Sequence, residues 1–247
     1  MMRFLAFPLL LMPVTAAFAQ EAGCYNGPLQ IGEKNPLRLM RVAADVPRVN
    51  FIEEKSEKKP ACPSLSEVCK RKGFLLAGDE VMAGPTKGDL VCVSYIAPDA
   101  KRVKGRFTET SGFLPASALE PAGNPPPKPG DFAFNWLRPD GEATIEISLN
   151  TSNTVRIKGE ATFGLFNPDR VRRGTVSSGE LVAEEAAIRG NAVAMGEGYT
   201  NPANPPSTDG YECQARLRLY GRYLAVEDNM QCGGINVSFV GFYIRER

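Results

Sequence analysis

Clusters of arginine along this chain could bind anionic groups, because a forked guanidinium can hold a carboxylate or a phosphate through two hydrogen bonds. The clusters are Arg170, Arg172 and Arg173 in a predicted loop, and Arg216, Arg218 and Arg222 on a predicted strand face and the turn after it. The alternative is that arginines at alternate strand positions form only the solvated face of a sheet and discourage pairing at its edge. Because loops carry binding residues more often than strand faces do, the loop cluster is the better ligand-binding candidate.

A further group of polar residues lies near the C-terminus. Asp228 and Asn229 precede Cys232-Gly233-Gly234, and their side chains could line a pocket that hydrogen-bonds a glycan or a peptide. The structural interpretation, which we favour, is that Asp and Asn tolerate left-handed turns and that the glycines fit where the chain passes close to a disulfide. Trp136, the single tryptophan, could stack on a sugar or close one end of a barrel. These three side chains complete the ligand-binding candidates.

Catalytic chemistry is restricted by the complete absence of histidine. Ser-His-Asp and Cys-His catalysis and histidine-ligated zinc are excluded, and the residue that most often transfers protons near neutral pH is missing. An enzyme would have to use carboxylates, Lys, Tyr or Ser-Lys chemistry. Two acidic pairs, Asp140 with Glu142 and Glu227 with Asp228, cannot be assigned a role because the separation that matters is spatial. We therefore predict no enzymatic activity, no catalytic residue, no metal and no cofactor.

The six cysteines are even in number, and no C-x-x-C spacing typical of redox or metal sites occurs. In an exported chain they predict three structural disulfides. Tyr220 facing Tyr223 across a two-residue turn would bring Cys213 within reach of Cys232. Short local bridges form readily around Pro63, which favours the other two pairs, Cys62 with Cys69 and Cys24 with Cys92.

Residues 1–19 are typical of a secretory signal peptide. Arg3 is followed by an apolar run from Phe4 to Val14 and then by Ala17-Phe18-Ala19, which predicts cleavage before Gln20. The apolar run is too short to cross a bilayer. The net charge of +1 offers no bulk attraction for nucleic acid or an anionic membrane. We expect a periplasmic or secreted protein with no membrane span and no nucleic-acid partner.

Short strands and turns, rather than helices, are predicted for the remainder of the chain. Residues 143–149 alternate without error between apolar and polar side chains, and residues 213–219 do so again before a predicted hairpin. A proline-rich linker at 122–130 separates a β domain at 20–121 from a second one at 131–247, and we expect the two to fold independently. The predicted fold class is all-β, with an antiparallel barrel or sandwich of roughly six to eight strands as the second domain.

Two short motifs in the first domain carry a family resemblance. Gly78-Asp79-Glu80-Val81 precedes a hairpin, and Gly112-Phe113-Leu114-Pro115 follows it. Through these motifs residues 73–121 resemble the bacterial SH3-like domain, which implies a small barrel of about five strands and partners in the cell wall or periplasm. Residues 116–118 are small where eukaryotic SH3 domains carry an aromatic residue, so polyproline binding is not expected. The ending from Tyr223 to Phe239 resembles a β module of uncharacterised exported bacterial proteins. This resemblance covers most of residues 131–247 and implies no particular activity.

The function predicted from these features is that of an exported, non-enzymatic periplasmic protein that binds a cell-envelope polymer or a partner protein. One alternative is a carboxylate-based hydrolase of cell-wall glycan, which would require two acids to converge in a cleft of the second domain. Another is an inhibitor of a secreted hydrolase of the lysozyme type. The near-neutral charge argues against the inhibitor, because a basic target would favour an acidic face.

Overall fold

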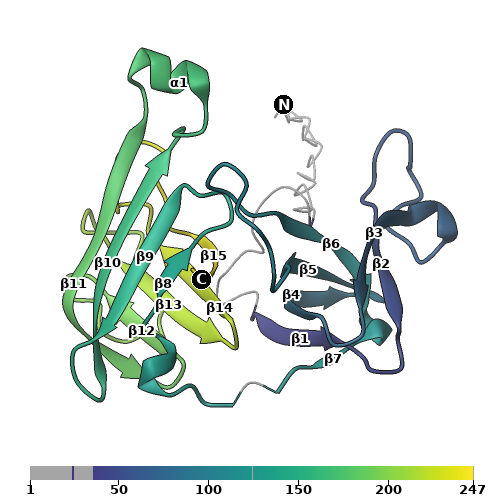
Figure 1. The fold of residues 1–247 in the computed structure, drawn as a ribbon, viewed down its shortest axis with the longest axis horizontal. Helices are drawn as coiled ribbons and strands as arrows, with labels where there is room; N and C mark the ends of the chain where they lie inside the picture. The colour runs from purple at the N-terminus through teal and green to yellow at the C-terminus, as the bar shows by residue number, and fades with distance from the viewer. Residues whose placement is uncertain (1–23, 25–35, 124, 247) are drawn as a thin grey trace, which may run out of the picture.

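The computed structural model describes Cys24 and residues 36–123 and 125–246, so the predicted signal peptide and its cleavage site at Gln20 lie outside the described residues. Nearly all regular structure in the described residues is β, which confirms the predicted fold class. The strands form two units that lie side by side, a sheet built from the earlier part of the chain and a barrel built from the later part (Figure 1).

The first unit is a seven-stranded antiparallel sheet in the order β3-β2-β6-β5-β4-β1-β7. Its strands are β1 (Arg38–Val42), β2 (Arg48–Ile52), β3 (Lys70–Leu76), β4 (Glu80–Lys87), β5 (Leu90–Ile96), β6 (Glu109–Pro115) and β7 (Leu119–Pro121). Its core contains Phe51, Leu75, Val81, Val93 and Leu114. β1 and β2, which precede residues 73–121, insert between β4 and β7 and between β3 and β6, so this unit has seven strands where the resemblance implies about five.

The second unit is a closed antiparallel barrel in the order β10-β11-β12-β13-β14-β15-β8-β9. Its strands are β8 (Asn135–Leu137), β9 (Ala143–Leu149), β10 (Thr154–Phe163), β11 (Ser177–Arg189), β12 (Ala192–Met195), β13 (Ala215–Tyr220), β14 (Tyr223–Asp228) and β15 (Gly241–Arg245). Ala143, Ile145 and Ile147 point inward, as strict alternation along β9 requires. The second domain is thus a barrel and not a sandwich.

The last strand is shorter than the alternation from residue 235 to 244 indicates. Val237, Phe239 and Tyr243 do lie in the barrel core, but β15 begins only at Gly241, which has φ +150°. Ahead of it, the Phe239 N–H donates to the Asp228 carboxylate instead of to a neighbouring strand. An alternating pattern therefore gave the correct inward side chains but not the start of the strand.

A buried apolar cluster joins the sheet and the barrel. Leu39, Met82 and Ile96 of the first unit pack with Tyr223 and Phe242 of the second, and the linker residue at position 122 lies in the same cluster. The Tyr223 hydroxyl also donates to the Glu80 carbonyl at 3.0 Å. This shared core does not fit the expectation of two independently folding domains on an extended spacer, because burial of common apolar surface couples their stabilities.

Three disulfides link the pairs that the sequence predicts: Cys24–Cys92, Cys62–Cys69 and Cys213–Cys232. The last follows from the hairpin register, in which Tyr220 does face Tyr223. Such bridges are typical of proteins that fold in an oxidising compartment. Among the described residues no helix has the length and apolarity needed to cross a membrane.

Candidate functional site

A cleft of about 590 Å³ lies between the two units, and residues of both units line it. Its charged lining consists of Arg106, Glu109, Arg138, Asp140 and Glu142, and its aromatic lining includes Phe163 and Phe166. A hollow of this size can accept a small organic ligand or one segment of a polymer. Because it combines both signs of charge with aromatic faces, it is the strongest candidate for a functional site.

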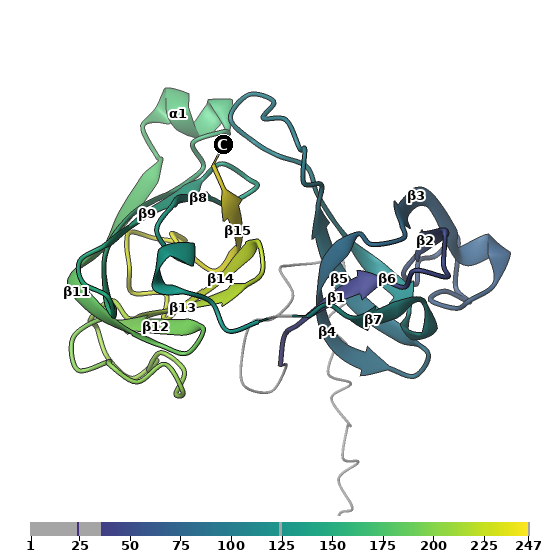
Figure 2. The same ribbon diagram turned by 60° about the horizontal axis from the view of Figure 1, so that its bottom comes forward.

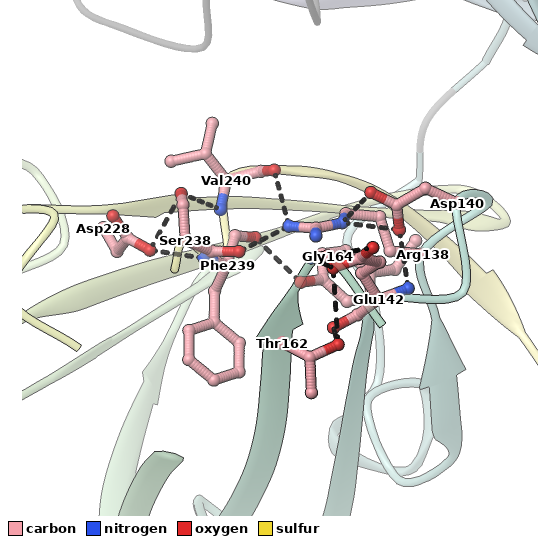
Figure 3. Close-up of polar contacts among 10 residues, drawn as sticks. Arg138, Asp140, Glu142, Thr162, Gly164, Asp228, Ser238, Phe239 and Val240 are labelled. Carbon is pink, nitrogen blue, oxygen red and sulfur yellow. Dashed lines mark hydrogen bonds and ion pairs between the residues drawn. The ribbon is translucent and has the colours of Figure 1, made fainter. Parts of the chain in front are cut away.

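The barrel side of the cleft is organised by Arg138, which follows β8 at the start of a tight turn (Figure 3). The Arg138 Nε lies 2.9 Å from both carboxylate oxygens of Asp140. A terminal nitrogen of the same guanidinium donates to the Ser238 and Val240 carbonyls. The turn needs Gly141, whose φ is +74° and whose missing Cβ would lie 2.5 Å from the Gly105 carbonyl oxygen. Arg138 therefore fixes the orientation of Asp140 and ties the turn to the chain before β15.

Glu142 is held by a separate set of hydrogen bonds in the same wall. Its carboxylate accepts the Gly164 N–H at 2.8 Å and the Thr162 hydroxyl at 3.4 Å (Figure 3). The Asp140 carboxylate in turn accepts the Glu142 N–H at 2.9 Å. Two acids of the second domain therefore do converge in a cleft, but each is already engaged by partners within the barrel.

The sheet side of the cleft comes from the connection between β5 and β6, which extends to the barrel (Figure 2). The Phe107 N–H donates to the Pro139 carbonyl at 2.8 Å, so this connection is attached to the Arg138 turn. The Arg106 guanidinium lies 5.1 Å from the centre of the Phe166 ring, a cation–π distance. Arg106 is exposed, and within the described part of the chain its guanidinium makes no hydrogen bond and no ion pair. It can therefore contact a ligand.

Glu109, at the start of β6, is the carboxyl group of the cleft with a perturbed acidity. Burial raises its pKa above the ordinary value, and the nearby Asp140 carboxylate adds to the increase. A hydrogen bond from the Ser94 hydroxyl and the charge of Arg138 act in the opposite direction. Glu109 consequently holds its proton to higher pH than an ordinary glutamate does.

The predicted arginine loop at 170–173 is wrong in its conformation and in its geometry. These residues form a helix, α1 (Pro168–Arg173), because Asn167 caps its N-terminus and Gly174 ends it with φ +64°. Arg170 lies over the Phe163 ring at 4.5 Å, Arg172 pairs with Asp169 at 2.7 Å, and Arg173 donates to the Asp169 carbonyl. The three guanidiniums do not converge on one point, and only Arg170 adjoins an aromatic residue of the cleft.

The other predicted ligand-binding residues have structural partners. Trp136 is fully buried and donates to the Phe132 carbonyl at 2.9 Å, so it cannot stack on a sugar. Asn229 is 5% exposed, and its amide bonds four backbone groups across positions 207–231. Asp228 accepts from the Met230 and Phe239 N–H groups and from the Ser238 hydroxyl. The turn interpretation of this C-terminal segment therefore describes the structure better than a binding pocket does.

The arginines of the predicted solvated strand face are also placed differently. Arg216 is 2% exposed and pairs with Glu227, which also pairs with Arg218. Arg222 lies at the junction of the two units, where it donates to the Ile96 carbonyl and lies over the Tyr223 ring. The face is not solvated because the segment between β12 and β13 covers it and accepts hydrogen bonds from Arg216. The alternation along β13 and β14 gives no sign of this covering segment.

Sequence reasoning did not select Arg106, Glu109 or Arg138 for this site. The run Arg138-Pro139-Asp140-Gly141-Glu142 combines a turn signal with three charged residues, so it could have indicated a charged turn. Glu109 carries no comparable local signal, because its burial and its proximity to Asp140 and Arg138 depend on the tertiary structure. Among the described residues no group of three His, Cys, Asp or Glu side chains could hold a metal ion. Comparisons with family models, curated proteins and solved structures found no match to this chain.

Proposed function

We propose that this chain is an exported, non-enzymatic periplasmic protein whose inter-unit cleft binds a cell-envelope polymer. The observation that carries the proposal is the composition of the cleft, in which Arg106 and Phe166 from different units meet beside the acidic residues Asp140 and Glu142. Such a surface is complementary to a ligand that carries both signs of charge and flat or apolar groups. The peptide-bearing glycan of the cell wall has this chemistry, whereas a uniformly anionic nucleic acid does not.

Rigidity of the cleft supports a binding role. The apolar cluster of the two units, the Phe107–Pro139 hydrogen bond and the Arg138 network hold its walls in place before any ligand arrives. A preformed site loses less conformational entropy on binding than a mobile one does. The three disulfides and the leader-like residues 1–19 support export to the periplasm.

The test is co-sedimentation of the purified protein with cell-wall sacculi. We expect Arg106→Ser to weaken binding about tenfold or more, because it removes the one exposed guanidinium of the cleft and its stacking on Phe166. Lys101→Ser is the matched control, since Lys101 is exposed in the same connection, carries the same charge and does not line the cleft. Equal binding by wild type and both variants would contradict the proposal.

A second candidate function, hydrolysis of cell-wall glycan, is favoured by one observation. Glu109, whose pKa burial raises, shares the cleft with Asp140, which ion-pairs with Arg138, and two carboxyl groups in such different surroundings can serve as proton donor and as base or nucleophile. Release of new reducing ends from sacculi, lost in Glu109→Gln while binding remains, would establish this activity. No release by the wild-type protein would leave binding as the function.

A further inference from the structure

We propose that a second hollow, on the outer wall of the barrel, binds an oxyanion carried by a small polar molecule. The hollow has a volume of about 380 Å³ and shares no lining residue with the inter-unit cleft. Its lining includes residues of β11, β12 and β13. These three strands are neighbours in the barrel (Figure 1). The side chains that matter for the proposal are Arg189, Asn191, Asn201 and Arg218.

The strand register explains why a hollow forms here. Arg189 of β11 faces Ala192 of β12, and Ala192 faces Arg218 of β13. Residues directly opposite on neighbouring strands project from the same side of a sheet. The two arginines therefore stand roughly 10 Å apart, two strand spacings, with only a methyl group between them. The gap is wide enough for an anionic group to contact both guanidiniums.

The charge balance of this wall is positive. Glu227 pairs with Arg216 at 2.7 Å and with Arg218 at 2.7 Å, so one carboxylate serves two guanidiniums. Arg216 uses its remaining donors on the Pro202 and Asn204 carbonyls. Because Glu227 is already shared, Arg218 retains positive charge that Glu227 does not neutralise.

Two donors in the hollow have no partner within the described ranges 36–123 and 125–246. The Nε of Arg218 is buried and makes no hydrogen bond. Arg189 is exposed, and its guanidinium makes no hydrogen bond and no ion pair in the same ranges. A buried N–H that lacks an acceptor is costly, and an oxyanion that draws the Arg218 guanidinium toward the hollow would supply that acceptor. This wall thus has the donors and the charge of an anion site.

The size and the amide groups of the hollow define the ligand class further. Its volume exceeds that of a free phosphate or carboxylate, and Asn191 and Asn201 line it beside the arginines. The Asn191 Nδ2 donates to the Leu219 carbonyl and the Asn201 Oδ1 accepts the Ala203 N–H, which leaves the other atom of each amide for hydroxyl groups of a ligand. A monosaccharide that bears a carboxylate or a phosphate fits these requirements.

Titration calorimetry at low salt tests the proposal with three sugars built on the same pyranose ring: glucuronate, glucose 6-phosphate and glucose. We expect saturable binding of one or both anionic sugars and none of glucose, and the arm that binds more tightly identifies carboxylate or phosphate as the preferred group. The affinity should fall as sodium chloride is raised, because exposed charges are screened.

Variants of the two arginines locate the site. Arg189→Gln should weaken binding about tenfold, and it leaves the fold intact because Arg189 is exposed and unpaired among the described residues. Arg218→Gln should weaken it at least as much, with a thermal melt to check folding since Arg218 pairs with buried Glu227. Arg172→Gln, an exposed arginine of α1, removes the same charge elsewhere and should leave binding unchanged. No binding of either anionic sugar, equal binding of glucose, or full binding by Arg189→Gln would each overturn the proposal.

Discussion

The cleft between the units and the hollow on the barrel wall have opposite charge balances. In the cleft the acids Glu109, Asp140 and Glu142 line the same space as Arg106 and Arg138, and burial among these charges raises the pKa of Glu109. On the wall, arginines outnumber the single acid Glu227, and the Nε of Arg218 lacks an acceptor. A chain of net charge +1 is thus locally uneven, and each hollow would be completed by a different partner.

Loss of the wall carboxylate should have the largest effect. Glu227→Gln leaves the buried Arg216 without its ion pair and Arg218 without its one charged partner. We expect the free energy of unfolding to fall by about 3–5 kcal/mol, because breaking a buried pair leaves an uncompensated buried charge. Urea denaturation measures this, and a loss of less than about 1 kcal/mol would mean that the pair behaves as a solvent-exposed one.

The next largest effect should come from the disulfide that fastens the covering segment over the wall. Cys213 and Cys232 are 19 residues apart, and their replacement by serine should cost about 3 kcal/mol in the chain-entropy model. The matched control is serine at Cys62 and Cys69, which are 7 residues apart in the first unit and should cost about 2.4 kcal/mol by the same model. Only the first change should also weaken sugar binding at the wall.

Removal of the perturbed carboxyl of the cleft should have a smaller effect that depends on pH. The pKa of Glu109 is raised in the folded protein from an ordinary value of 4.5. Between that pH and the raised pKa, the native state binds more protons than the unfolded state does. Wild-type stability should therefore fall as pH rises through this window, and Glu109→Gln should lack that decline and be more stable above it. Thermal melts of both proteins from about pH 4 to about pH 8 give the slope of stability against pH, over the range in which a raised carboxyl pKa acts. Equal slopes would contradict the desolvation of Glu109.

The helix α1 should show the smallest effect and provides a reference for both hollows. Asp169 and Arg172 form an exposed pair with side-chain exposures of 65% and 75%. Asp169→Asn should change the free energy of unfolding by about 0.5 kcal/mol or less, because exposed pairs are screened by water and salt. A loss of stability comparable to that of Glu227→Gln would show that burial does not distinguish the Arg216 pair from the Arg172 pair.

Patterns of neighbouring residues predicted those parts of the fold that depend on local geometry. Alternation along β9 identified the side chains of the barrel core, and Tyr220 opposite Tyr223 fixed a register that placed Cys213 near Cys232. The helix α1 was missed because one and a half turns are too short to show a 3.6-residue period, although Asn167, Pro168 and Gly174 are its capping signals.

What the sequence by itself determined is therefore the all-β class, the inward and outward faces of the regular strands and the disulfides Cys62–Cys69 and Cys213–Cys232, because each depends on residues close in the chain or joined through a hairpin. Cys24–Cys92 spans 68 residues and was predicted only as the remaining pair. Only the tertiary structure decided which polar residues are exposed, paired or desolvated. Arg216 is buried because the segment between β12 and β13 covers it, Trp136 because the barrel closes around it, and Glu109 lies buried near Asp140 and Arg138 of the second unit. The Arg216–Glu227 pair follows from the hairpin register, but the burial that makes it costly to break depends on other segments and leaves no local pattern.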